Sequence, residues 1–163
     1  VPSEVAWFTS LTELNLEKNL LTEIPLEISL LNDLSSLNLS HNRLTRLPKG
    51  LCGLPSLIQL NLSHNEMTRV PPEVECLVGL LELDLSHNRV TQLAAEVGRL
   101  ENLAVLDLSF NQLTEVPAEL ARLENLVRLD LRGNPLPAPD ELLERTHEPM
   151  ELIRHLLPQE VEG

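Results

Sequence analysis

The sequence has very few aromatic residues. It contains no Tyr, one Trp and two Phe, and aromatics make up 2% of its 163 residues. Leu occupies 40 positions, so any buried core must be aliphatic. No apolar run approaches the roughly 18 residues that a membrane-spanning helix needs. We therefore expect a soluble chain with no membrane insertion.

Positive charge and cysteine are also scarce. The chain has 12 Lys and Arg against 25 Asp and Glu, a formal net charge of −13, which disfavours binding to the phosphate backbone of nucleic acids. Cys52 and Cys76 are the two cysteines, without the cysteine clusters that staple small secreted domains. We interpret both as small, partly buried apolar residues, and favour a reducing, cytoplasmic compartment.

A period of 23 residues organises the sequence. The unit that begins at Leu11 recurs with starts at 34, 57, 80, 103 and 126. Each unit reads L-x-x-L-x-L-x-x-N-x-L/M/V, and the Asn is present every time, from Asn19 to Asn134. The L-x-L alternation predicts a short strand with its leucines inside. Units this small bury their leucines only by stacking on one another.

These residues resemble the leucine-rich repeat family. The resemblance implies an α/β fold, a right-handed horseshoe solenoid with a parallel sheet on its concave face and short helical or 3-10 turns on its convex side. The 23-residue form with a corner such as Ile24-Pro25 resembles the intracellular repeats of Ras-suppressor, Scribble-like and Roco-type proteins. Extracellular members of the family usually carry Cys-rich caps, and the sequence has none.

Two regions are predicted along the chain. The repeats extend over residues 1–139, with a partial repeat over 1–10, and a helical cap and tail follow over 140–163. Because the chain opens in mid-repeat without an initiator Met, we expect it to be part of a longer protein. In the cap, Asp140 is expected to cap a helix that runs through Arg145. A second helix should begin near Pro149 and end at Pro158, with Met150, Ile153, Leu156 and Leu157 on one side.

Equivalent repeat positions become columns of side chains on one surface. Positions three and five, counted from the first Leu, should face the concave side, and position eight carries His or an aromatic in the central repeats. The columns change from Asn and Ser in repeats one to three to Asp, Phe and Arg in repeats four to six. We therefore predict that a partner binds the C-terminal half. The predicted partner-binding set is Glu82, Asp84, His87, Val105, Asp107, Phe110, Arg128, Asp130 and Arg132.

Phe110 and a set of arginines depart most from the repeat consensus. An exposed aromatic flanked by Arg has the composition of a binding hot spot, although Phe110 could instead fold against its own repeat. Arg residues at positions ten and thirteen form a basic rim on an acidic chain, either as a solvated edge or as a docking edge for an acidic partner. This secondary set comprises Arg43, Arg46, Arg69 and Arg89.

Catalytic and metal sites are weaker interpretations of the same columns. Ser86, His87 and Asp84 supply the residue types of nucleophilic catalysis, but no Gly-rich elbow or oxyanion donors accompany them. Histidines at 41, 64 and 87 fall on neighbouring strands, yet the outer pair of a straight ladder would be about 10 Å apart. We therefore expect no enzyme activity, no metal and no other cofactor.

Taken together, these features predict a protein-interaction module. We expect a scaffold or adaptor region of a larger intracellular signalling protein that is monomeric as this fragment and binds a protein on its concave face. The family resemblance implies small GTPases or their regulators as partners. The alternative is an extracellular recognition fragment of a leucine-rich repeat receptor. The glycan-type sequons at Asn38 and Asn61 favour that alternative, and the missing Cys caps oppose it.

Overall fold

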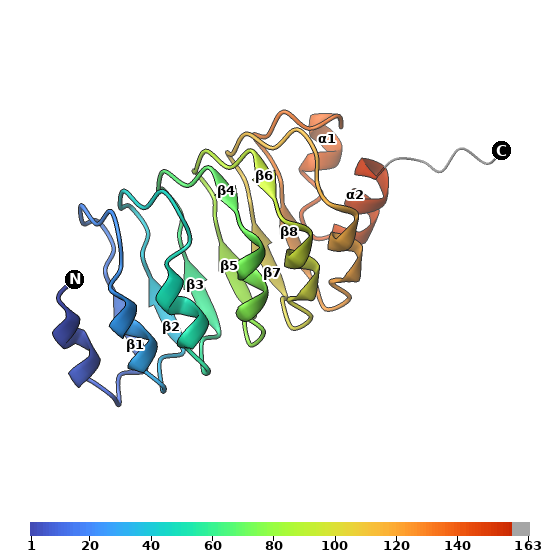
Figure 1. The fold of residues 1–163 in the computed structure, drawn as a ribbon. Coiled ribbons are helices and arrows are strands. Elements are labelled where there is room, and N and C mark those ends of the chain that lie inside the picture. Colours follow the sequence, from blue (N-terminus) through green and yellow to red (C-terminus); the bar gives the residue numbers. More distant parts are fainter. Residues whose placement is uncertain (158–163) are drawn as a thin grey trace.

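Each repeat contributes one short strand, and the strands lie side by side in a parallel sheet along one side of a curved solenoid (Figure 1). The computed structural model describes residues 1–157. The predicted tail over 158–163, with Pro158 as a helix end, lies outside the described residues. The main sheet runs in the order β1 (Glu13–Asn15), β2 (Ser36–Asn38), β3 (Gln59–Asn61), β5 (Glu82–Asp84), β7 (Val105–Asp107) and β8 (Arg128–Asp130).

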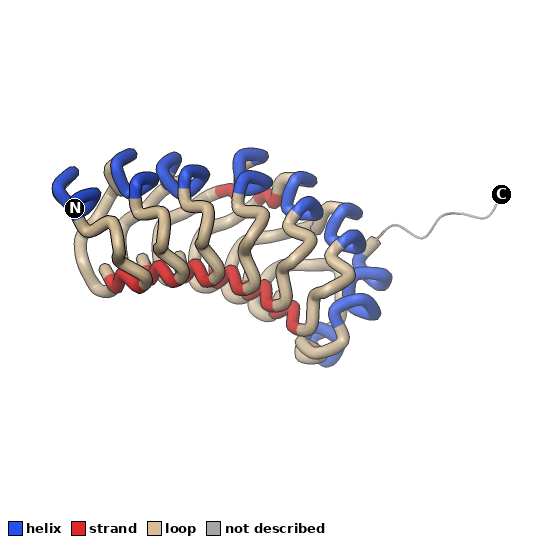
Figure 2. Tube along the Cα trace, turned by 90° about the horizontal axis from the view of Figure 1, so that it is seen from below, coloured by secondary structure: helices blue, strands red, loops and turns tan. Residues whose placement is uncertain are grey.

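Short 3-10 helices cover the opposite side of the solenoid (Figure 2). A second, two-stranded parallel sheet lies beside them, formed by β4 (Arg69–Val70) and β6 (Gln92–Leu93). The predicted parallel sheet and convex 3-10 turns are thus confirmed. The 3-10 helices are η1 (Ser3–Trp7), η2 (Leu26–Leu30), η3 (Lys49–Gly53), η4 (Pro72–Cys76), η5 (Ala95–Arg99) and η6 (Ala118–Arg122).

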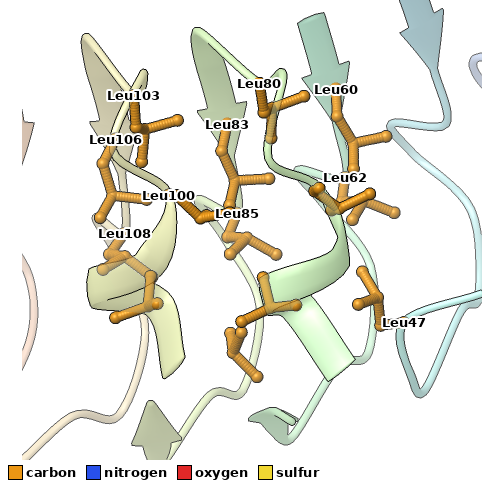
Figure 3. Close-up of a cluster of buried hydrophobic side chains, with 14 of the residues drawn as sticks. Leu47, Leu60, Leu62, Leu80, Leu83, Leu85, Leu100, Leu103, Leu106 and Leu108 are labelled. Carbon is orange, nitrogen blue, oxygen red and sulfur yellow. The ribbon is translucent and has the colours of Figure 1, made fainter. Parts of the chain in front are cut away.

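The strand register aligns equivalent positions of successive repeats. Leu37 pairs with Leu60, Leu60 with Leu83, and so on to Leu129. Each of these central leucines is buried, and leucines of neighbouring coils point into one common interior (Figure 3). At the open edge, Leu14 of β1 is only half-buried because no strand lies beyond it.

The recurring Asn is the main polar connection between coils. Asn88 donates through Nδ2 to the carbonyl oxygens of Leu62, Leu85 and Ser86 at 3.0 to 3.2 Å, and its Oδ1 accepts the N–H of Met67 at 3.0 Å. Asn42, Asn65 and Asn111 repeat this pattern. These backbone groups face the interior, where an unpaired polar group would be costly. The Asn therefore makes the turn compatible with burial.

The residue before each Asn adopts a left-handed backbone conformation. Its φ lies between 53° and 56° from Lys18 to Phe110, and Gly133 takes φ 70° in the last repeat. For a residue with a Cβ this conformation costs about 1–2 kcal/mol. The cost recurs in the five repeats that carry a side chain at this position and is offset by the hydrogen bonds of the following Asn. Position eight is consequently held in the same orientation in each coil.

Two helices close the C-terminal end of the sheet. In α2 (Pro149–Leu156), Leu152 and Ile153 are fully buried, and the helix packs against η6. The predicted apolar side included Ile153 but missed Leu152. The first helix, α1 (Asp140–Leu143), ends before Arg145, and no side-chain bond caps it, so the predicted cap at Asp140 is wrong.

The two cysteines form a disulfide. Cys52 in η3 and Cys76 in η4 have Cα atoms 5.2 Å apart, and Cys52 is exposed. The interpretation as a partly buried apolar residue is therefore wrong for Cys52, whereas Cys76 is partly buried against the core as well as disulfide-bonded. Stacking brings equivalent positions of neighbouring repeats side by side, and these two Cys occupy convex positions that differ by one residue. No helix within residues 1–157 is long and apolar enough to cross a membrane.

We expect Asn88→Ala to lower the free energy of unfolding by about 2–4 kcal/mol, because it leaves several buried backbone groups without partners. Urea denaturation measures this loss. Asn19→Ala is the matched control at the open edge, where the side chain is exposed and makes two hydrogen bonds. It should cost less than about 1 kcal/mol. Equal losses of stability at both positions would contradict the conclusion that Asn88 matters because the backbone groups it binds are buried.

Candidate partner-binding face

Two rows of predicted residues run across the concave sheet. The register places Glu82, Val105 and Arg128 in one row. Asp84 and Asp107 lie in the next row, two residues further along each strand. These five residues help to line a shallow hollow of about 340 Å³ that extends over β2, β3, β5, β7 and β8. The structure thus gathers more than half of the predicted set around one concavity.

Arg128, Asp130 and Arg132 form an ionic cluster at the C-terminal end of the sheet. Arg132 donates through Nε to Asp130 Oδ1 at 2.9 Å, and Arg128 Nη2 lies 3.4 Å from Asp130 Oδ2. Asp130 is only 1% exposed, so the expectation that it faces a partner is wrong. Its carboxylate instead holds two half-exposed guanidinium groups in place.

Charge and burial act in opposite directions on Asp130. Burial alone would raise the pKa of its carboxyl group. Hydrogen bonds and charge from Arg132, assisted by Arg128, outweigh burial and hold the pKa of Asp130 below its ordinary value. Arg128 also reaches Asp107, with Nη2 3.8 Å from Oδ2. Its Nε is buried and has no hydrogen-bond partner in the part of the chain that the structure describes.

Position eight forms a stacked column of rings along the C-terminal edge of the strands. His41, His64, His87 and Phe110 stack face to face with centroids 4.1, 4.2 and 4.5 Å apart and planes within 12° of parallel. Phe110 is the last ring and is 52% exposed. It packs against His87 of the preceding repeat and over Gly133, where an added Cβ would lie 2.7 Å from Phe110 Cδ1.

The positions of Ser86 and of the stacked histidine rings do not favour a catalytic or a metal site. Ser86 is buried, and no hydrogen bond joins it to His87 within residues 1–157; Asp84 Oδ1 accepts the backbone N–H of Ser86 instead. The lone pairs of an imidazole lie in the ring plane, so the stacked rings do not converge on one ion. In the described part of the chain, no group of His, Cys, Asp and Glu is arranged to hold a metal ion.

The amides of the two sequons are used within the protein. Asn38 Oδ1 accepts the backbone N–H of Ser40 at 3.0 Å, and Asn61 Oδ1 accepts both the backbone N–H and the hydroxyl of Ser63. Both Asn side chains are half-buried in the concave sheet. Attaching a glycan at either position would cover the hollow described above.

Two of the four arginines of the secondary set line one hollow. Arg46 and Arg69 line a hollow of about 360 Å³ beside η3, on the side opposite the main sheet. Arg89 forms an ion pair with Glu66, Nη1 to Oε2 at 3.3 Å. Arg43 is exposed and does not line that hollow. A docking edge that includes all four arginines stays a prediction.

Sequence reasoning missed an exposed apolar row at position two of the repeat. Ile58, Leu81 and Val127 precede β3, β5 and β8 and are 41%, 42% and 63% exposed. Backbone hydrogen bonds connect this row from one coil to the next, through the N–H of Leu81 to the carbonyl of Ile58 and of Val127 to Ala104. The sequence contains a signal for this row, because position two is polar in repeats one and two and apolar in the later repeats. This row lies directly beside the first row of the concave face.

Acid should destabilise the ring column. Burial lowers the pKa of His64, and the charges of His87 and His41 lower it further, whereas Asp84 raises it. The unfolded chain therefore binds more protons than the folded chain as pH falls below about 6.5. We expect the stability contributed by neutral His64 to be present above that pH and to be lost as pH falls toward 5. His64→Gln should flatten the decline in urea midpoint between pH 7 and pH 5. An unchanged decline would contradict this assignment.

Comparisons with known proteins agree with this architecture. The chain is similar to a chain in the crystal structure of PEPR1–AtPEP1, at 31% identity and TM-score 0.73 over 83% of this chain and 20% of that one. It is similar to a plant ice-binding protein, at 37% identity and TM-score 0.73 over 83% and 46% of the two chains. A third similar structure is the functional domain of InlJ from Listeria monocytogenes, which includes a cysteine ladder, at 30% identity and TM-score 0.69 over 87% and 30%.

The chain spans less than half of the length of each of these proteins. No curated protein matches the sequence. The family described as "Leucine rich repeat" matches residues 9–73 and 77–136. Together with the stacked parallel strands and the Asn in every coil, this match shows that the chain belongs to the leucine-rich repeat family.

Proposed function

We propose that the chain is a non-enzymatic protein-interaction module that binds a protein partner on its concave face, mainly through its C-terminal half. Leucine-rich repeat domains are generally protein–protein interaction modules. The observation that carries the choice of face is the hollow of about 340 Å³, which brings Glu82, Val105 and Arg128 together with two carboxylates. The exposed row of Ile58, Leu81 and Val127 adds apolar area beside it.

Rigidity supports the same proposal. Side chains on the sheet are fixed by strand register, and the arginines of the cluster are held by a buried carboxylate. A surface that is ordered before binding loses little conformational entropy when a partner docks. Phe110 at the edge offers an aromatic side chain already positioned by stacking, which is a feature of interface hot spots.

Two cellular compartments are candidates for the module, one intracellular and one extracellular. The 23-residue repeat resembles intracellular repeats, which supports a scaffold or adaptor in a cytoplasmic signalling protein, with a small GTPase or its regulator as one candidate partner. The Cys52–Cys76 disulfide favours the second candidate, an extracellular recognition fragment, because disulfides persist in oxidising compartments. Proteins with similar structures include a chain of PEPR1–AtPEP1 and the InlJ domain with its cysteine ladder.

Paired substitutions in the same columns test the concave face. We expect Phe110→Ala and Glu82→Lys each to weaken binding of a purified partner by about 1–3 kcal/mol. His41→Ala and Glu13→Lys are the matched controls, in the same columns near the other end of the sheet, and each should change affinity by less than about 0.5 kcal/mol. Affinities are measured by calorimetry with a partner first captured on the immobilised chain. The assignment fails if the four variants bind alike while substitution of Arg46 and Arg69 abolishes binding.

The state of the cysteines distinguishes the two settings. Protein recovered from its native cells would be alkylated before reduction, and intact mass would report blocked or free thiols. The extracellular candidate predicts an intact disulfide with no alkylated cysteine. Two alkylated cysteines would instead favour the intracellular candidate, since cytosolic thiols are kept reduced.

A further inference from the structure

A continuous groove crosses the side of the solenoid opposite the main sheet. Three neighbouring hollows of about 170, 360 and 310 Å³ make it up. Arg46, Pro48 and Lys49 line both the first and the second hollow, and Arg69 and Pro71 line both the second and the third. Because each hollow shares walls with the next, the groove is one linear feature along the corners of successive repeats. We call it the corner groove.

The middle of the corner groove is basic. Arg46, Lys49 and Arg69 are exposed there, and none of them forms an ion pair or a side-chain hydrogen bond with any residue from 1 to 157. Glu23, Glu73 and Glu115 also line the groove, and none of them pairs with these cations in the part of the chain that the structure describes. Three cations without partners are unexpected on a chain of net charge −13. An anionic ligand would supply the acceptors that the protein does not.

The basic groups are specific to two repeats. Arg46 and Arg69 occupy the same repeat position, thirteen, whereas Glu23, Gln92 and Glu115 hold it in other repeats. The cluster is therefore no part of the repeat consensus. It sits where η3 and η4 are joined by the disulfide, and Cys52 itself lines the central hollow.

Apolar walls accompany the charges. Leu47, Pro48 and Pro71 line the central hollow, and the exposed Leu26 lines its neighbour. A phosphate ion alone would leave these walls unused. An elongated ligand with carboxylates and aliphatic side chains would use both features. At about 4.8 Å per repeat, a groove over repeats one to five is roughly 20 Å long, the length of about six extended residues.

We propose that the corner groove binds an extended acidic peptide segment of a protein partner, with its carboxylates on Arg46, Lys49 and Arg69 and its aliphatic side chains on the proline and leucine walls. The groove and the concave face lie on opposite sides of the solenoid, so this site is independent of the proposed function.

Fluorescence anisotropy with a labelled, acetylated and amidated peptide of alternating Glu and Leu tests the proposal. The full chain should bind this peptide in low salt, and the double variant Arg46→Glu/Arg69→Glu should weaken binding at least about ten-fold. The matched control, Arg43→Glu/Arg122→Glu, makes the same change in net charge at exposed positions outside the groove and should change affinity less than about two-fold. Phe110→Ala should leave peptide binding intact, whatever it does to a concave partner.

Three results would overturn the proposal. Equal losses in both double variants would show attraction by net charge alone. Absence of binding to the Glu-Leu peptide would exclude extended acidic peptides as ligands of the groove. Tighter binding of a single-stranded oligonucleotide than of the peptide would assign the groove to nucleic acid. Circular dichroism of each variant checks that the fold persists, and Arg46→Gln/Arg69→Gln, which adds no negative charge, should show an intermediate loss of affinity.

Discussion

The hydrogen bonds of one side chain per repeat make the rest of the structure possible. A coil that turns sharply after a three-residue strand points several backbone carbonyls and an N–H toward the interior, where no water reaches them. Asn has both two donor hydrogens and an acceptor oxygen on a short side chain, and Asn42, Asn65, Asn88 and Asn111 use all of them. Asp lacks the donors and Gln is longer by one methylene, so neither reproduces the pattern. The turn fixes the register, and the register fixes every surface column.

The surfaces differ in character because the consensus constrains them unequally. Leucines at the strand centres are required for packing, whereas the side chains at positions eight and thirteen are mostly exposed and vary between repeats. At position eight the fixed left-handed turn orients side chains so uniformly that His41, His64, His87 and Phe110 stack. At position thirteen the corners of successive coils leave a hollow between them, and two arginines line it. Variation at such positions on a common frame is how one fold acquires separate binding surfaces.

The period and the alternation within it were enough to predict the short strands and the stacking of equivalent positions. The resemblance to the leucine-rich repeat family implied the parallel concave sheet on which Glu82, Val105 and Arg128 lie. Features that depend on contacts between non-equivalent positions were not predicted. Asp130 belongs to a column that is half-buried in repeats two to five, yet it is itself almost fully buried and is bound by arginines two residues away on either side. The cysteine pair was readable in principle, since a separation of 24 is one period plus one residue and stacking brings such positions together. The apolar row at position two was not predicted, because this position lies outside the L-x-L alternation and carries polar residues in repeats one and two.

The Cys52–Cys76 disulfide lies at the corner groove, and whether it persists depends on the redox state of the cellular compartment. In a solenoid each repeat contacts mainly its neighbours, so local opening between two coils is governed by the interface they share. The Cys52–Cys76 bond joins η3 to η4 at the interface where Arg46 and Arg69 line their hollow. Constraining that interface limits the relative movement of the two coils that carry these arginines, which reduces the entropy lost on binding. Reduction would release this constraint at the groove and leave the main sheet, on the other side of the core, held by its own hydrogen bonds. The redox state of one bond therefore bears on the corner groove more than on the concave face.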